Sequence, residues 1–145
     1  MATNVKAIPD GYHTVTPYIV INGVAKLIEF VKSSFGATEV MRHTRPDGSV
    51  MHAEVRIGDS VIMMGEAPAG GKHFPAMLHL YVDDVDATYQ RALEAGATSL
   101  REPTDQIYGD RSGGVQDEFG NQWWLAKHLE DVSEEEMARR MAATK

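Results

Sequence analysis

The chain has 145 residues, of which 43% are hydrophobic and 24% are charged, and its formal net charge is -7 at pH 7. A chain of this length forms one compact domain or two small halves that share a core, and the composition is ordinary for a globular protein. The acidic balance argues against nucleic acid as a main partner, because binding to phosphates requires clustered Lys and Arg. Cysteine is absent, which excludes disulfides, thiolate nucleophiles and cysteine-ligated zinc.

The sequence also lacks the signals of a membrane or secreted protein. No apolar run reaches the roughly 18 residues that a membrane helix needs. The initial segment, MATNVKAIPDGYH, has no apolar core of the kind found in signal peptides. We therefore expect a cytoplasmic protein with no membrane partner.

The first half of the chain predicts a strand, a helix and three further strands. Residues 14–21 are rich in β-forming residues, and the apolar residues that follow recur at helical spacing until Gly36. Asn22 is a plausible N-cap for this helix. The three further strands are expected over residues 38–44, 50–57 and 60–65. In the second of these, His52, Glu54 and Arg56 alternate with apolar residues, so they share one face.

The second half repeats this order after a connector rich in Gly and Pro at residues 67–75. The expected elements are a strand over 77–82, a helix over 85–95 that Asp83 or Asp84 caps, and strands over 98–101, 111–116 and 122–127. We expect Pro103 to stop the first of these last three strands, and Trp123 to lie in the core. Ser133 and Glu136 form a capping box, which predicts a C-terminal helix over about 133–142.

The tripeptide Gly-Ala-Thr at residues 36–38 recurs at residues 96–98, each time between a helix and a strand. An internal repeat of this kind indicates two copies of one supersecondary unit. We predict an α+β fold made of two tandem β-α-β-β-β modules, at about 12–66 and about 76–128, followed by the C-terminal helix.

Three blocks of sequence carry a resemblance to a known family: MHAEVRIGDSVIMMGE, YVDDVDATYQRALEAGAT and YGDRSGGVQDEFGNQWWLAKH. In this order they resemble the vicinal oxygen chelate superfamily, which includes glyoxalases, bleomycin resistance proteins and dioxygenases. The stretches 51–54 and 108–111 are most similar to a phosphonate-operon-like, glyoxalase-related subgroup. The resemblance implies a single domain over 1–145, in which a curved mixed sheet surrounds a cavity, and it implies a homodimer.

Enzymes of this superfamily bind one divalent metal ion through His and Glu side chains on four strands. The resemblance places the corresponding positions at about Thr16, Met63, Met77 and Trp124. None of these residues is a usual ligand of a divalent metal, so we expect a cavity without metal or other cofactor. The alternative is one divalent metal ion on shifted ligands, namely His52, Glu54 and His79.

Strand alternation and the resemblance together assign candidate site residues to the cavity. The candidate acid/base residues are His52, Glu54 and His79, each of which could instead be a hydrogen-bonded structural residue. The candidate ligand-binding residues are Thr16, Tyr18, Met63, Met77, Tyr81, Tyr108, Arg111 and Trp124. Such an aromatic and thioether lining suits a flat or apolar ligand. Arg111 would clamp an anionic or polar group, or would pair with Asp110 to hold its loop.

Three functions are compatible with these residues. We favour binding of a small organic molecule without chemistry, as in bleomycin resistance proteins. A metal-free enzyme that uses His52, Glu54 or His79 as acid or base is the second possibility. The third is a metal-dependent lyase, isomerase or dioxygenase of the glyoxalase kind, and whether the protein is an enzyme at all stays open.

Overall fold

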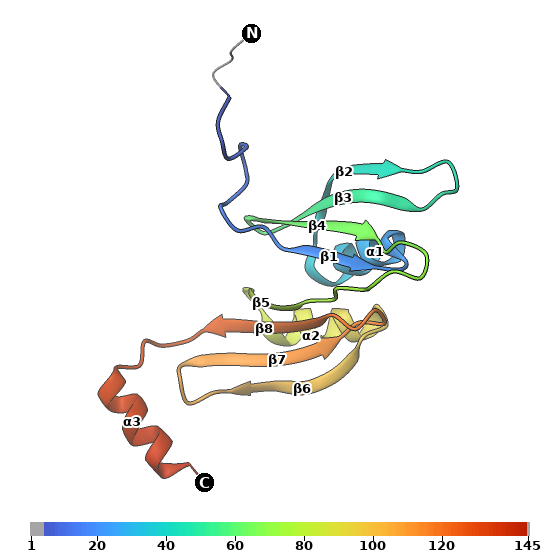
Figure 1. Cartoon of the computed structure of the whole chain (residues 1–145). Coiled ribbons are helices and arrows are strands. Elements are labelled where there is room, and N and C mark those ends of the chain that lie inside the picture. Colours follow the sequence, from blue (N-terminus) through green and yellow to red (C-terminus); the bar gives the residue numbers. More distant parts are fainter. Residues whose placement is uncertain (1–4, 145) are drawn as a thin grey trace. The chain divides into compact units, whose positions relative to one another are not determined.

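The computed structural model describes residues 5–144, and residues 1–4 and 145 lie outside it. The chain divides into two compact units, Met1–Pro75 and Ala76–Lys145. Each unit contains one four-stranded sheet and a helix that packs on it (Figure 1). The α+β class and the order of elements predicted from the sequence are thereby confirmed.

The first unit has the sheet order β1-β4-β3-β2, in which β1 runs parallel to β4 and the other pairs are antiparallel. Its elements are β1 (Tyr18–Ile21), α1 (Val24–Phe35), β2 (Thr38–Thr44), β3 (Val50–Ile57) and β4 (Ser60–Glu66). Helix α1 packs on β3 and β4. Its apolar stripe, which includes Leu27, Ile28 and Val31, is fully buried together with Ile19 and Met64 of the sheet.

Helix α1 begins differently from the sequence prediction. Its N-cap is Gly23 rather than Asn22, so the cap residue has no side chain that could accept a hydrogen bond. Instead, the carboxylate of Glu66 accepts from the backbone N–H groups of Gly23 (2.7 Å) and Val24 (3.2 Å). A carboxylate at the end of β4 therefore satisfies the free N–H groups of the first turn, which a local capping rule does not detect.

The second unit has the order β5-β8-β7-β6 and again one parallel pair, β5 with β8. Its elements are β5 (Met77–Tyr81), α2 (Val85–Glu94), β6 (Thr98–Asp105), β7 (Asp110–Gln116) and β8 (Gln122–His128). The two sheets thus have the same topology, as the internal repeat predicts. Asp84 caps α2 by accepting from the backbone N–H of Ala87 at 3.0 Å.

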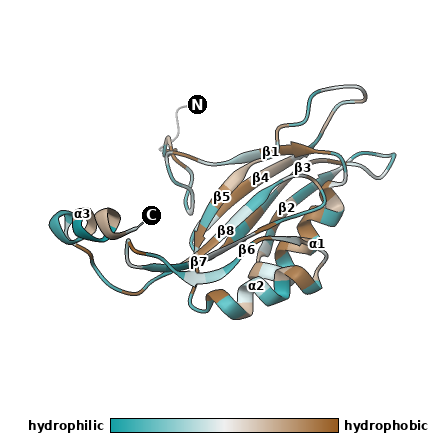
Figure 2. Cartoon of the chain, turned by 90° about the horizontal axis from the view of Figure 1, so that it is seen from below, coloured by the Kyte–Doolittle hydropathy of each residue, from teal (hydrophilic) through white to brown (hydrophobic). Residues whose placement is uncertain are grey.

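Helix α3 (Glu134–Ala143) follows the second sheet and extends away from it (Figures 1 and 2). Ser133 accepts from the backbone N–H of Glu136 at 3.1 Å, which confirms the predicted cap. No residue of α3 is buried in the described chain. Arg140 attaches the helix to the sheet unit by donating to the carbonyl oxygen of Ile107.

Two strands differ in length from the prediction by more than one residue. The first strand was expected from Thr14, but β1 begins at Tyr18, because Pro17 has no N–H to donate to a neighbouring strand. Strand β6 was expected to stop at Pro103 but continues to Asp105. Its pairing with β7 is irregular between Arg101 and Thr104, which accommodates a proline in this edge strand.

The turn between β7 and β8 is organised around the buried carboxylate of Asp117. This carboxylate accepts four hydrogen bonds of 2.9 Å, from the backbone N–H groups of Phe119 and Asn121, from Asn121 Nδ2 and from Trp123 Nε1. Trp123 is 0% exposed, as predicted for the core. No helix among residues 5–144 combines the length and apolar character that crossing a membrane requires.

The segment after β8 contains a histidine held between two carboxylates. His128 Nδ1 lies 2.7 Å from Asp110, and Nε2 lies 2.7 Å from Asp131. Hydrogen bonds to Asp110 and then to Asp131 raise the pKa of His128 above its ordinary value of 6.5. The stabilisation from this group is therefore fully present below the ordinary pKa and is lost as the pH rises through the raised pKa.

We expect His128→Gln to remove this part of the pH dependence of the free energy of unfolding. The measurement is denaturant unfolding of both proteins over a pH series that crosses the ordinary histidine pKa. His73→Gln, a change at an exposed histidine of the connector, is the matched control and should keep the wild-type slope. Equal slopes for wild type and His128→Gln would show that protonation of His128 between the two carboxylates contributes no pH-dependent stability.

Candidate functional site

The sheet of the first unit brings four of the predicted site residues together. Strand pairing places Tyr18 of β1 opposite Met63 of β4, and Met63 opposite Glu54 of β3. His52 lies two residues from Glu54 and pairs with His43 of β2. Paired residues point to the same side of a sheet, so these side chains share the face opposite α1.

Hydrogen bonds join the polar members of this face into a chain. Glu54 is only 5% exposed, and its two oxygens contact Tyr12 Oη and His52 Nε2, the latter at 2.7 Å. Tyr18 Oη lies 2.9 Å from His52 Nδ1. An ionised carboxylate accepts only, so His52 Nε2 donates to Glu54 and Nδ1 accepts from the phenol of Tyr18.

The pKa shifts of Glu54 and Tyr12 agree with these donor and acceptor roles. Burial opposes ionisation of Glu54, but hydrogen bonds from Tyr12 and His52 outweigh it and hold the pKa of the carboxyl below its ordinary value. The hydrogen bond to Glu54 raises the pKa of Tyr12, so this phenol stays protonated. The result is a fixed imidazole between a carboxylate and a phenol, an arrangement suited to proton transfer.

A glycine allows Tyr18 to reach His52. A Cβ atom at Gly65 would lie 2.9 Å from Tyr18 Oη and 3.3 Å from Tyr18 Cε1. The phenol therefore lies across the sheet at Gly65, where any larger residue would displace it. Tyr18 is 46% exposed and forms the solvent-accessible end of the chain of hydrogen bonds.

The second sheet presents a comparable face. His79 of β5 lies opposite Trp124 of β8, Trp124 lies opposite Gly114 of β7, and Gly114 lies opposite Arg101 of β6. The ring of Tyr81 packs edge-on against His79, with centroids 5.1 Å apart. These residues occupy the face opposite α2, because Trp123 and Leu125 of β8 point into the core on the other side.

Trp124 is placed between a glycine and an arginine. A Cβ atom at Gly114 would lie 2.5 Å from Trp124 Cε3, so the indole rests directly on the backbone there. The guanidinium carbon of Arg101 lies 5.0 Å from the indole centroid, within the range of a cation–π interaction. Arg101 Nη2 also donates to the buried hydroxyl of Ser112.

The remaining predicted ligand-binding residues lie in several environments. Met77 of β5 is 68% exposed and Tyr81 is 69% exposed. Thr16 precedes β1, and its hydroxyl donates to the carbonyl oxygen of His13 at 3.4 Å. Tyr108 lies in the turn before β7 and is exposed.

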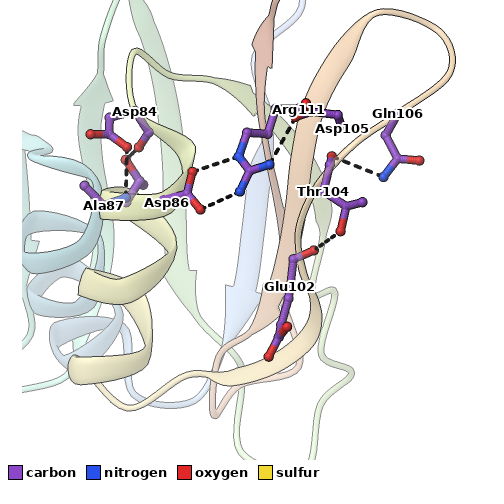
Figure 3. A network of polar contacts seen from close by, with 9 residues as sticks. Asp84, Asp86, Ala87, Glu102, Thr104, Asp105, Gln106 and Arg111 are labelled. Carbon is purple, nitrogen blue, oxygen red and sulfur yellow. Dashed lines mark hydrogen bonds and ion pairs between the residues drawn. The ribbon is translucent and has the colours of Figure 1, made fainter.

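Arg111 lies on the face of the second sheet that packs against α2 (Figure 3). Its Nε and Nη2 atoms each lie 2.8 Å from the carboxylate of Asp86 on α2, and Nη1 lies 3.0 Å from Asp105 of β6. These carboxylates raise the pKa of Arg111. The alternative in which Arg111 pairs with Asp110 is wrong, because Asp110 contacts His128 instead. Since its donors join helix to sheet, we leave Arg111 out of the site proposed below.

The residues present do not fit the divalent metal of the resembled enzymes. Among residues 5–144, no three His, Asp or Glu side chains are grouped closely enough to hold a metal ion. The four corresponding positions offer a hydroxyl, two thioethers and an indole. Both ring nitrogens of His52 are also within hydrogen-bond distance of other side chains.

Sequence reasoning missed three members of these faces. His43 and Arg101 lie within predicted strands, so alternation could have assigned them once the neighbouring strand was known. Tyr12 lies before the first strand, where no periodic signal exists. Its contact with Glu54 depends on how the N-terminal segment crosses the sheet.

The sequence is similar to a known protein family and to known proteins over most of its length. The model of the Glyoxalase/Bleomycin resistance protein/Dioxygenase superfamily matches residues 12–125. An uncharacterized protein of Mycobacterium bovis is 38% identical over 139 residues, which cover 88% of this chain and 91% of that protein.

Solved structures share the fold at lower sequence identity. TioX from Micromonospora sp. ML1 has a TM-score of 0.64 at 22% identity, over 79% of this chain and 99% of that chain. The fosfomycin resistance protein FosX from Mesorhizobium loti has a TM-score of 0.60 at 16% identity, over 81% of this chain and 92% of that chain. At these identities the likeness concerns the fold alone.

Proposed function

Because the chain belongs to the glyoxalase/bleomycin resistance protein/dioxygenase superfamily, we propose that it binds a small, flat organic molecule without the divalent metal of the metal-dependent members. The observation that carries the proposal is the placement of two aromatic rings over glycines. Tyr18 lies over Gly65 in the first unit, and Trp124 lies over Gly114 in the second. Trp124 occupies one of the positions that the resemblance assigns to metal ligands, and Tyr18 pairs with Met63, which occupies another.

Exposure of apolar side chains on the same faces supports binding. Tyr18, Met77 and Tyr81 are between 46% and 69% exposed although they are large. Covering apolar surface contributes roughly 25 cal/mol per Å², so a ligand gains affinity by burying Tyr18 in the first unit, or Met77 and Tyr81 in the second. Aromatic and thioether groups favour a flat partner, and each unit has a histidine on the same face for a polar contact, His52 in the first unit and His79 in the second.

The test is a binding screen on protein freed of metal by dialysis against a chelator. A panel of neutral and charged bicyclic aromatic compounds is titrated while intrinsic fluorescence and thermal stability are followed. We expect saturable binding that chelator does not alter, and a loss of about tenfold in affinity in Tyr18→Ala or Trp124→Ala. Met141→Ala removes a side chain that is 58% exposed on α3 and should leave affinity unchanged. Absence of saturable binding, or its loss on chelation, would contradict the proposal.

A second candidate function is metal-free acid/base catalysis in the first unit. The observation that favours it is the continuous chain from Tyr18 through His52 to Glu54 and Tyr12. Glu54 fixes the imidazole in the tautomer that is protonated at Nε2, whose Nδ1 accepts from Tyr18, and Tyr18 is accessible to a substrate. His79 lies in the second unit and has no part in this hydrogen-bonded chain.

The proposal retains three further expectations. One is membership of the phosphonate-operon-like subgroup, which rests on the stretches 51–54 and 108–111. The others are assembly as a homodimer and a cytoplasmic location, which rest on the resemblance and on the composition of the chain.

A further inference from the structure

Within the part of the chain that the structure describes, the guanidinium of Arg101 has no carboxylate partner, which sets it apart from the ion-paired arginines. Four others are ion-paired with Asp or Glu, namely Arg42, Arg111, Arg139 and Arg140. Among residues 5–144, no ion pair involves Arg101, although the chain carries a net charge of -7. Its described contacts are the indole of Trp124 and the hydroxyl of Ser112.

The position of this guanidinium is fixed by buried or close-packed neighbours. Ser112 is 1% exposed and accepts from Nη2, while the indole beneath rests on Gly114. Asp110, a carboxylate that the register of β7 places on this face, is buried and engaged by His128. A guanidinium has five N–H donors, so most of the donors of Arg101 are left for a ligand.

We propose that Arg101 and Trp124 form a binding site for an aromatic carboxylate. The carboxylate of the ligand accepts paired hydrogen bonds from the edge of the Arg101 guanidinium, and its ring system contacts Trp124 and the neighbouring His79. The exposed ring of Tyr81 packs against His79 and extends the aromatic surface. This inference rests on the proposed function and adds the charge of the ligand to it.

The two tryptophans provide a specific readout. The indole N–H of Trp124 donates to Gln122 at 3.1 Å, whereas that of Trp123 donates to buried Asp117 at 2.9 Å. A ¹⁵N-labelled sample therefore gives one indole signal from the proposed site and one from the core, and Trp124→Phe assigns them. The probes are 2-naphthoate and its neutral counterpart 2-naphthylmethanol.

We expect 2-naphthoate to shift the Trp124 signal saturably, to leave the Trp123 signal nearly unchanged, and to bind more tightly than 2-naphthylmethanol. Arg101→Gln should weaken 2-naphthoate by about tenfold or more and should leave 2-naphthylmethanol unaffected. Arg101→Lys keeps the charge but loses the planar guanidinium, so its affinity for 2-naphthoate should fall between those of wild type and Arg101→Gln. An unchanged Trp123 signal shows that each variant is folded.

The matched control is Arg45→Gln, which makes the same change in charge at an exposed arginine that bonds Ser49 in the β2–β3 turn. Equal weakening by Arg45→Gln and Arg101→Gln would overturn the inference, because the effect would then be one of net charge. Binding of 2-naphthylmethanol at Trp124 as tight as that of 2-naphthoate would overturn the selectivity for anions and leave the proposed function standing. If neither probe shifts Trp124, the inference fails, and the wider screen then decides the proposed function separately.

Discussion

Replacing Asp117 with Ala is expected to lower the free energy of unfolding by about 3–4 kcal/mol. The carboxylate is 5% exposed and accepts four hydrogen bonds. Its removal leaves Trp123 Nε1 and Asn121 Nδ2, both on residues that are 0% exposed, without this acceptor. A buried donor that loses its acceptor lowers the free energy of unfolding by more than the net contribution of the hydrogen bond itself. This penalty accounts for the large expected effect.

The measurement is denaturant unfolding monitored by tryptophan fluorescence. Asp117→Asn keeps the shape and part of the acceptor capacity, so an intermediate loss is expected. Asp83→Ala removes an exposed carboxylate before α2 and should change stability by less than about 0.5 kcal/mol. A loss in Asp117→Ala no larger than that of Asp83→Ala would show that the turn does not depend on this carboxylate.

Replacing Glu54 with Gln is expected to destabilise the first unit by about 2 kcal/mol at neutral pH. A glutamine has the same size but cannot accept from Tyr12 and His52 with both of its terminal atoms. The lowered pKa of Glu54 means that its stabilisation is present above the ordinary carboxyl value of 4.5 and is lost as the pH falls through the lowered pKa. The difference between wild type and Glu54→Gln should therefore shrink on acidification.

The same substitution separates the two candidate functions. If the first unit transfers protons, exchange of an acidic C–H of a bound ketone with deuterium from D₂O should slow by about 10²-fold or more in Glu54→Gln. Tyr12→Phe removes one donor but keeps the carboxylate, so a smaller effect is expected. Glu94→Gln, an exposed change on α2, should leave both stability and exchange unchanged. Equal exchange in wild type and Glu54→Gln would exclude the acid/base function for Glu54.

Features with a short sequence period could be predicted from the sequence. The two-residue period of strands placed His52 and Glu54 on one face and separated Trp123 from Trp124, and the repeat predicted two sheets of equal topology. The caps of α2 (predicted as Asp83 or Asp84, and found at Asp84) and of α3 at Ser133 could also be predicted, because their partners lie three residues away.

Features that depend on contacts distant in sequence could not be predicted. Glu66 caps a helix that begins more than forty positions earlier, and Tyr12 reaches Glu54 from a segment without regular structure. Alternation alone does not say which face of its strand Arg111 occupies. Its register with Lys127 places it on the face that packs against α2. The role proposed for Arg101 depends on its contact with Trp124. Trp124 lies on β8, which does not pair with β6, the strand of Arg101.

The most direct test of a metal-free binding protein is its metal content. Protein purified without a metal-affinity tag would be analysed for elements before and after loading with zinc, nickel, manganese and, under anaerobic conditions, ferrous iron. We predict that no metal is retained in stoichiometric amount after desalting, because the described residues offer no set of three ligands. Tight retention of stoichiometric metal would contradict this, and would make His52, Glu54 and His79 the first ligands to replace.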